Sequence, residues 1–485
     1  MFKLNLLFPG IPIHLIRSVR PILATQALSC AMFVLLVLLV LLAGSAYAAD
    51  TDNPATLPAA WFPQLPAWSP QLLGAQATFI YQNMPAFHSP YIGQDSLRFD
   101  HGLGQEMSQT YGVYLGSQVT RYFQTYLDVE MFQGNGLSRG VGLGGYTNGD
   151  VLRAGSADLG NAPYLARLIG RYLIPLSGEL GEPVERGMDQ LPGKEPADRI
   201  EIKGGKLTPT DDFDLNRYAN NQRTQFLNDA FLYNLAWDYA ADTRGYTIGA
   251  SIALVHPSWR LILGSYQMPT TANGNVLDDQ IYHAREDDLE LTLKPPSTGT
   301  VIRLLAFHNE GQMGDFRDAM AAAAATGTTP DVAADTRPGH VKYGFGVNLE
   351  QPLADDGETG LFARAGWANG TNATWCYAEV DRDVTAGVQV SGSHWYRNDD
   401  RFGMAYGVDG LSGSHRHYLE EGGIGMVIGD GALNYGLEQI FEAYYRIQLG
   451  RYVQLSPDYQ HIVNPAYNKD RGPVDVYGVR LRLSY

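Results

Sequence analysis

The ten residues from Val476 to Tyr485 alternate strictly between two kinds of side chain. Because successive side chains of a strand point to opposite faces, this pattern predicts a strand with one oily face and one wet face. Two kinds of structure need such a strand: an outer-membrane barrel, which is apolar outside and hydrated inside, and a soluble sandwich. The apolar face would hold Tyr477, Val479, Leu481, Leu483 and Tyr485, and the other face Val476, Gly478, Arg480, Arg482 and Ser484.

An export signal near the N-terminus favours the barrel. The apolar run 33–42 follows three basic residues and precedes Ala-Tyr-Ala at 46–48, which has the small-x-small form of a cleavage site. We therefore expect residues 1–48 to be a signal peptide, with a retained membrane anchor as the alternative. Beyond residue 48 no run approaches the roughly 20 apolar residues that a spanning helix needs. A mature chain that crosses a membrane would have to do so as a closed barrel.

The same alternation recurs in segments 123–131, 342–350 and 441–449. In each of them apolar side chains occupy one face, and carboxylates or cations occupy the other. A dry core would not tolerate these charges, whereas a water-filled interior would. Short connections also alternate with long ones along the chain, as they do when one barrel rim has turns and the other has loops.

This order of turns and loops predicts how the strands are joined. Counted from the first expected strand at 75–82, the strand at 199–207 ends on the loop side; counted back from the C-terminus, the strand at 245–255 begins there. Residues 208–244 should therefore form one long connection, although 226–237 is apolar and has the spacing of a short helix. Leaving this segment out of the sheet predicts 16 strands, an even number as bacterial barrels require.

The chain is thus predicted to be all-β: a 16-stranded antiparallel transmembrane β-barrel of the outer membrane with an inward-folded constriction loop. We expect a proline-rich periplasmic leader at 49–73 and the barrel domain at 74–485, with the constriction loop at 208–244. That loop is too apolar to lie wholly in solvent, so it should pack on the barrel wall. The segment 175–198 fits this scheme poorly, because it is long for a turn.

Composition excludes several classes of function. A net charge of −16 argues against a nucleic-acid partner. Cys30 lies in the expected signal, so Cys376 has no partner for a disulfide or a thiolate metal site. His415 and His417 lie close together but without an evident third ligand, and we expect no metal and no cofactor. The common nucleophile, phosphate-loop and zinc-protease motifs are missing from the sequence, so we do not expect an enzyme.

The expected constriction loop is rich in residues suited to sugars. Asp214, Asn216, Arg217, Tyr218 and Arg223 place planar donors and acceptors beside an aromatic ring. Such groups can match ring hydroxyls in pairs, while the aromatic face stacks on the C–H side of a pyranose. Other polar and aromatic residues have a simpler interpretation: a turn or helix cap for Asp211 and Asp212, wall charge for Arg480 and Arg482, and girdle or loop packing for Trp237, Trp367 and Trp375.

Five stretches resemble the carbohydrate-selective porin (OprB) family, and the similarity runs from about residue 74 to the end. They are 81–91 (YQNMPAFHSPY), 206–228, 237–242 (WDYAAD), 342–351 (KYGFGVNLEQ) and 458–473 (DYQHIVNPAYNKDRGP). The resemblance implies a 16-stranded outer-membrane porin that passes glucose and related sugars by facilitated diffusion. The sugar preference depends mainly on this resemblance, whereas the barrel and the inward loop are also predicted from the residues themselves.

Carried onto this chain, the resemblance implies a substrate-binding constriction. Its candidate residues are Arg217, Arg223, Asp214, Asn216, Tyr218, Glu130, Lys206 and Asp238. Two alternatives remain: a general or anion-preferring porin, since arginines at a narrow point favour anions, and a surface structural or adhesion protein. We expect as partners small sugars, outer-membrane lipid, the barrel-assembly machinery through the strand ending at Tyr485, and further copies of the chain in a homo-oligomer.

Overall fold

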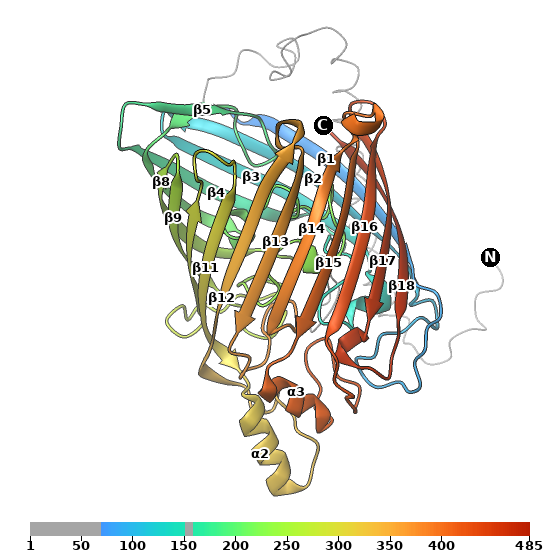
Figure 1. Ribbon diagram of the computed structural model, residues 1–485. Helices are drawn as coiled ribbons and strands as arrows, with labels where there is room; N and C mark the ends of the chain where they lie inside the picture. The colour runs from blue at the N-terminus through green and yellow to red at the C-terminus, as the bar shows by residue number, and fades with distance from the viewer. Residues whose placement is uncertain (1–68, 151–158) are drawn as a thin grey trace, which may run out of the picture.

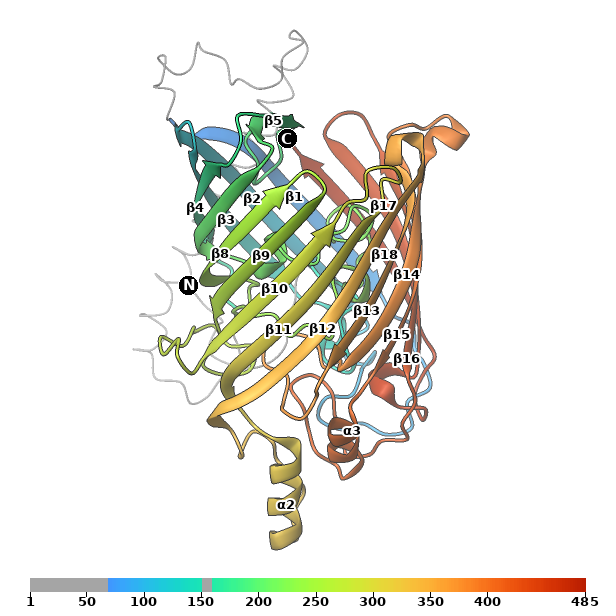
Figure 2. The ribbon, with the colours of Figure 1, turned by 60° about the vertical axis from the view of Figure 1, so that its left-hand side comes forward.

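The computed structural model describes residues 69–150 and 159–485, and its main element is a closed antiparallel barrel of 16 strands. The predicted fold class is therefore confirmed. The expected signal peptide and most of the expected leader lie outside the described residues. The first strand begins at Gln71, slightly before the expected start of the barrel domain at residue 74. Figure 1 shows the barrel from the side, and Figure 2 shows the same strands after a turn of 60°.

The strands follow one another around the barrel in chain order, except that β5 and β6 form a separate two-stranded sheet. The barrel strands are β1 (Gln71–Asn83), β2 (Gln105–Thr120), β3 (Phe123–Gly134), β4 (Tyr164–Pro175), β7 (Arg199–Leu207), β8 (Thr247–His256), β9 (Trp259–Gln267), β10 (Arg285–Leu293), β11 (Val301–Met313), β12 (Arg337–Ala354), β13 (Thr359–Ala368), β14 (Arg382–Ser391), β15 (Arg401–Gly410), β16 (Glu438–Gln448), β17 (Val453–Val463) and β18 (Val474–Ser484). Two helices, α2 (Phe316–Thr326) and α3 (Gly413–Glu420), extend from the rim that has the long loops (Figure 1).

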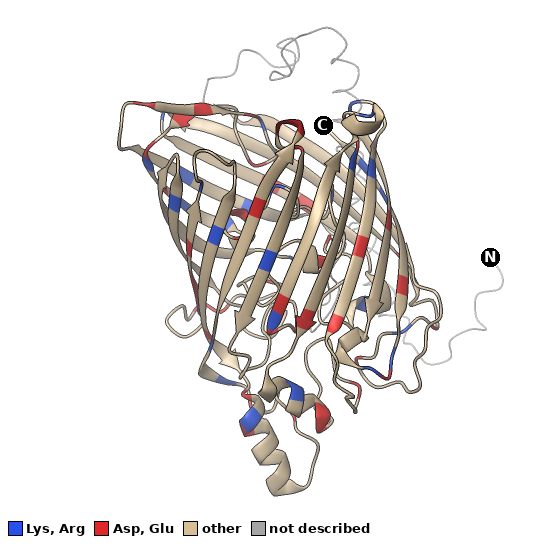
Figure 3. Cartoon of the chain, viewed as in Figure 1, with Lys and Arg blue, Asp and Glu red and all other residues tan. Residues whose placement is uncertain are grey.

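Side chains alternate between the two barrel faces as the sequence predicts. On β18, Tyr477 and Val479 are 51% and 46% exposed, whereas Arg480 is only 1% exposed. Charged residues lie at several levels along the strands (Figure 3), and on β3 and β16 the alternation places carboxylates such as Glu130 and Glu442 on the buried face. The outer face is therefore apolar and the interior polar. No helix among the described residues is long and apolar enough to cross a membrane.

The barrel closes between its first and last strands. β1 pairs antiparallel with β18 from Gln76 opposite Ser484 to Asn83 opposite Tyr477. The backbone N–H of Tyr485 donates to the carbonyl oxygen of Ala75 at 2.9 Å. Closure leaves the 16-stranded sheet without an unpaired edge, so its strands can satisfy their backbone groups in lipid.

The segment 175–198, which was too long for a turn, contains a small hairpin at the turn side of the barrel. Its strands β5 (Leu180–Val184) and β6 (Gly193–Pro196) pair only with each other. β4 and β7 pair directly, with Pro175 opposite Arg199, so the hairpin is an insertion that does not change the strand count.

Candidate functional site

The long connection between β7 and β8, residues 208–246, contacts inward-facing side chains of many strands. It bonds to Glu130 on β3, Glu290 on β10, Glu442 on β16 and Arg480 on β18, so it lies inside the barrel. The short helix expected within 226–237 is reduced to a single 3₁₀ turn at Asp229–Phe231, and a second 3₁₀ turn occurs at Pro209–Asp211. We call this connection the inner segment.

Carboxylates on the inner faces of β10 to β16 hold the backbone of the inner segment. Glu290 accepts from the N–H of Asp214 at 2.7 Å, and Glu442 accepts from the N–H groups of Leu227 and Asn228 at 2.5 and 2.9 Å. An irregular segment in a barrel leaves many backbone N–H groups without a ladder partner, and these must be satisfied. The acidic residues of this wall supply the acceptors. Further contacts of the same kind are made by Glu286 to Ala240, Glu350 to Arg217 and Asp383 to Ala236.

Arg364 on β13 makes more hydrogen bonds to the inner segment than any of these carboxylates. Its fully buried guanidinium pairs with Asp214 at 3.0 Å and donates to the carbonyl oxygens of Phe231, Ala219 and Leu232. One side chain thus joins two separate parts of the inner segment, 214–219 and 231–232, to the same strand.

Glycines on the same strands let the inner segment come close. A Cβ atom at Gly346 would lie 2.2 Å from Nδ2 of Asn234, and one at Gly366 would lie 2.0 Å from Oδ1 of the same residue. At Gly360 the ring of Tyr218 occupies the space in the same way. We call the inner faces of β10 to β17 the packed wall, because the inner segment covers them.

A cavity of about 770 Å³ lies between the inner segment and the other side of the barrel. Its wall consists of residues from β2, β3, β4, β7 and β9, which we call the open wall, together with Arg482 of β18. The charged lining residues are Glu130, Asp150, Arg167, Arg171, Asp189, Arg199, Glu201, Lys203, Asp211, Asp212, Arg223, Arg244, Arg260 and Arg482, and the aromatic ones are Tyr114, Tyr126, Phe132, Tyr233, Tyr239, Tyr246 and Tyr377.

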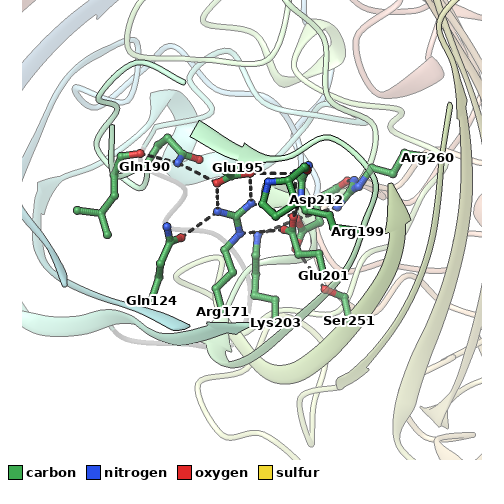
Figure 4. Close-up of polar contacts among 12 residues, drawn as sticks. Gln124, Arg171, Gln190, Glu195, Arg199, Glu201, Lys203, Asp212, Ser251 and Arg260 are labelled. Atoms are coloured by element: carbon green, nitrogen blue, oxygen red, sulfur yellow. Dashed lines mark hydrogen bonds and ion pairs between the residues drawn. The ribbon is translucent and has the colours of Figure 1, made fainter. Parts of the chain in front are cut away.

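Most charges of the open wall form ion pairs, and two groups of these are drawn in Figure 4. Arg171 of β4 pairs with Glu201 at 2.8 Å and with Glu195 of the hairpin. Lys203 and Arg260 both contact Asp212, at 2.8 and 3.2 Å. Their donors and acceptors border the cavity, so a solute there meets fixed polar groups rather than an apolar surface.

Arg223 connects the inner segment to the open wall. Its guanidinium contacts Glu130 at 2.9 Å and Asp150 at 2.7 Å, and it also donates to the hydroxyl of Tyr114. Glu130 additionally accepts from the hydroxyl of Tyr246 at 2.6 Å. These contacts hold charged and phenolic groups in place beside the cavity, both on the inner segment and on the open wall.

The structure brings two of the predicted site residues, Arg223 and Glu130, together at the cavity. The others do not line it. Asp214 and Asn216 bond to Asn348 on the packed wall, and the hydroxyl of Tyr218 donates to the carbonyl oxygen of Gly357. Arg217 pairs with Glu358 at the turn side, and Asp238 pairs with Lys342. Lys206 lies opposite Leu168 and Ile248, and both of these face outward.

Sequence analysis missed most of the open wall. Arg167 and Arg171 of β4 and Arg260 of β9 line the cavity, yet sequence analysis did not single out any of the three. The signal that could have found them is alternation: on β7, Glu201 and Lys203 flank the outward-facing Ile202.

The tryptophans have packing roles. Nε1 of the buried Trp237 donates to Glu286, and Nε1 of Trp375 donates to the carbonyl oxygen of Pro269. Trp367 packs against Tyr343 and Phe345 on the outer face.

His415 lies in a buried cluster under the long loops. It stacks on Phe316 with ring centroids 4.4 Å apart and contacts Asp381 at 3.0 Å. Burial opposes its charge, but Asp381 and Glu379 outweigh burial and raise the pKa of His415 to about 9. Within the two described ranges, no group of three His, Cys, Asp or Glu residues could hold a metal ion.

A closed barrel with an apolar outer face, a polar interior and an internal cavity defines a channel protein of the bacterial outer membrane. The family described as carbohydrate-selective porin, OprB family, matches residues 104–485. The chain belongs to this family of outer-membrane porins, whose substrates are small solutes.

A solved porin structure has a similar fold. The high-pH structure of Pseudomonas putida OprB is similar with a TM-score of 0.62 at 15% identity, covering 86% of this chain and 94% of that one. The outer-membrane channel DcaP of Acinetobacter baumannii is also found, with a TM-score of 0.46 at 10% identity, covering 86% and 97%. The comparison with curated proteins gave no match.

Proposed function

We propose that this porin lets neutral carbohydrates such as glucose enter the periplasm by passive diffusion. The observation that supports this most is the cavity between the inner segment and the open wall. Its guanidinium, carboxylate and phenol groups are held in place by ion pairs such as Arg223 with Glu130. Fixed planar donors and acceptors can replace the water that a sugar loses, and tyrosine rings can contact its C–H faces.

The inner segment would act as the constriction. In this proposal a sugar passes along the open wall, because the packed wall is covered. The sugar exchanges its water for contacts with residues such as Arg223 and Tyr246 and leaves down its concentration gradient. Binding has to stay weak, since a deep energy well would slow exit.

A liposome-swelling series tests the proposal. Liposomes with the purified full-length protein would be exposed to glucose, xylose, a disaccharide and a neutral amino acid of similar size to xylose. We expect the two monosaccharides to enter faster than the amino acid and the disaccharide to enter slowly. Equal rates for xylose and the amino acid would favour a general porin, and no entry of any solute would argue against a channel.

Two finer features belong to this proposal. We expect the barrel-assembly machinery to recognise β18, which ends beside the aromatic Tyr485, and we expect that the chain can form a homo-oligomer in the membrane. Crosslinking in whole outer membranes would test both, because it would capture the assembly partner during biogenesis and any neighbouring copy afterwards.

A further inference from the structure

The charges that border the cavity are not all neutralised. The acidic lining residues each contact a cation: Glu130 and Asp150 contact Arg223, Asp189 and Asp211 contact Arg167, Asp212 contacts Lys203, and Glu201 contacts Arg171. Arg482 also lines the cavity, but it has no carboxylate oxygen within 4.0 Å in the described part of the chain. Its neighbours are Gln454, Ser484 and the sulfur of Met188.

Two more arginines of the same kind lie on the inner wall beside Arg482. Arg480 is on the same face of β18, where it is 1% exposed and donates to the carbonyl oxygens of Gln222 and Gln225. Arg446 on β16 faces inward, opposite Arg401 of β15. Neither of the two contacts a carboxylate within 4.0 Å among the described residues. We call Arg446, Arg480 and Arg482 the arginine site.

Each member of the arginine site also has a buried N–H without an acceptor. Nε of Arg446, Nη2 of Arg480 and Nε of Arg482 have no hydrogen-bond partner in the described structure. A buried donor without a partner is costly, and a charged one more so. Three such donors on two nearby strands indicate a place that favours a negatively charged acceptor.

The carboxylates closest to the arginine site have other partners. Glu442 accepts from the backbone of the inner segment, and Oδ1 of Asp458 accepts from Gln460 at 3.1 Å, whereas its Oδ2 has no hydrogen-bond partner in the described structure. Glu358 contacts Arg217 and Arg401, and Asp400 contacts Arg397. The positive charge of the arginine site is therefore not compensated by direct contacts, although the whole chain has a net charge of −16.

We propose that the arginine site makes the channel favour carbohydrates with one carboxylate, that is, sugar acids, over neutral sugars of the same size. This inference rests on the proposed function, because the sugar part is recognised by the same cavity. Arg482 would contact the carboxylate directly, since it lines the cavity. Arg446 and Arg480 would raise the local positive potential. A monoanion suits this role better than a dianion such as a sugar phosphate, because a tightly bound dianion would leave slowly.

Efflux from liposomes tests this inference. Liposomes containing the full-length protein would be loaded with glucose and gluconate together, and a second set with glucose 6-phosphate. The membrane potential would be held at zero with potassium and valinomycin, and each solute would be assayed enzymatically outside. We expect gluconate to leave about three to ten times faster than glucose at low salt, and the ratio to fall as salt screens the arginines.

Variants connect the effect to the site. Arg482→Gln should bring the gluconate-to-glucose ratio close to one, because the charge-dependent part of the gluconate flux is lost. Arg482→Lys should keep part of the preference. Arg451→Gln, in the exposed turn after β16, makes the same charge change on the same side of the barrel and should leave the ratio unchanged. Arg446→Gln is a second test if Arg482→Gln fails to fold, as judged by heat-modifiable migration.

Three results would overturn the inference. They are equal efflux of gluconate and glucose from the wild type, a gluconate-to-glucose ratio that neither Arg482→Gln nor Arg446→Gln changes, and faster efflux of glucose 6-phosphate than of gluconate. A failure of the proposed function would be seen separately, as glucose efflux no faster than from protein-free liposomes.

Discussion

The packed wall and the open wall use similar residues for different purposes. On the packed wall, carboxylates such as Glu290 and Glu442 accept from backbone N–H groups of the inner segment. On the open wall, Glu130 and Glu201 pair with guanidinium groups beside the cavity. Both sets face inward, at alternating positions along their strands. An inward-facing charge is thus not by itself a solute contact, because on the packed wall it replaces the backbone partners that an irregular segment lacks.

The largest effect, on single-channel conductance, is expected from Arg364→Ala, which removes contacts between the packed wall and the inner segment. It removes the ion-pair partner of Asp214 and the donor to four carbonyl oxygens. Loss of one member of a buried ion pair typically costs about 3–5 kcal/mol. We expect the inner segment to detach from the packed wall. Because the constriction would then be wider, single-channel conductance should rise about twofold.

Arg317→Ala is the matched control for Arg364→Ala. Arg317 lies on α2 and contacts Ser414 outside the barrel, so conductance should not change. Hydrogen exchange of residues 214–236 should accelerate in the Arg364 variant only. Wild-type conductance and exchange in that variant would show that the inner segment is held by other contacts.

A smaller effect is expected from Arg223→Ala, which changes the open wall. The substitution removes the contacts to Glu130 and Asp150. Glu130 keeps the hydroxyls of Tyr114 and Tyr246 as donors, so the wall itself should stay in place. We expect glucose to block the current less, because the apparent affinity should fall about two- to fivefold. A loss of this size is expected when one charged hydrogen bond is removed where water can replace it.

Arg223→Lys separates charge from geometry in that experiment. Lysine keeps the positive charge but cannot contact both carboxylates with a planar fork. Glucose block should therefore fall in Arg223→Lys as well, though less than in the alanine variant. A block equal to that of the wild type in both variants would place sugar contacts elsewhere on the open wall.

A third effect is smaller again and concerns the loops above the packed wall. The pKa of His415 is raised to about 9, because Asp381 and Glu379 outweigh burial. The raised pKa stabilises the folded loops fully below the ordinary histidine value near 6.5, and this stability is lost as the pH rises through about 9. Hydrogen exchange in α3 should therefore accelerate above pH 9, while the gluconate and glucose permeabilities stay constant.

His415→Gln is the control for the pH effect. It removes the titrating group, so exchange in α3 should be fast at every pH and lose its step near pH 9. A step of equal size in His415→Gln would assign the pH dependence to another group.

Sequence alone predicted the barrel well and the site only in part. Alternation placed Arg480 and Glu130 inward, and the order of turns and loops identified the inner segment as one connection. The same rules could not place Asp214, because its partner Arg364 is 150 positions away and the pair depends on how an irregular segment lies against a sheet. The hairpin at 180–196 was missed for a related reason: its two strands pair only with each other, so the barrel's periodicity does not reveal them.

The smallest effect is expected from Arg217→Ala, although sequence analysis ranked Arg217 with Arg223. Its guanidinium contacts Glu358 at 2.8 Å, but the two side chains are 41% and 40% exposed, and Glu358 has a second partner in Arg401. Exposed pairs of this kind contribute about 0–1 kcal/mol. We expect conductance and glucose block to match the wild type in planar bilayers. Arg217 and Arg223 lie in the same segment and have the same charge. A difference in glucose block between their alanine variants would therefore reflect where each residue lies relative to the cavity. A fall in glucose block as large as that of Arg223→Ala would mean that the sugar's path also includes the turn side of the packed wall.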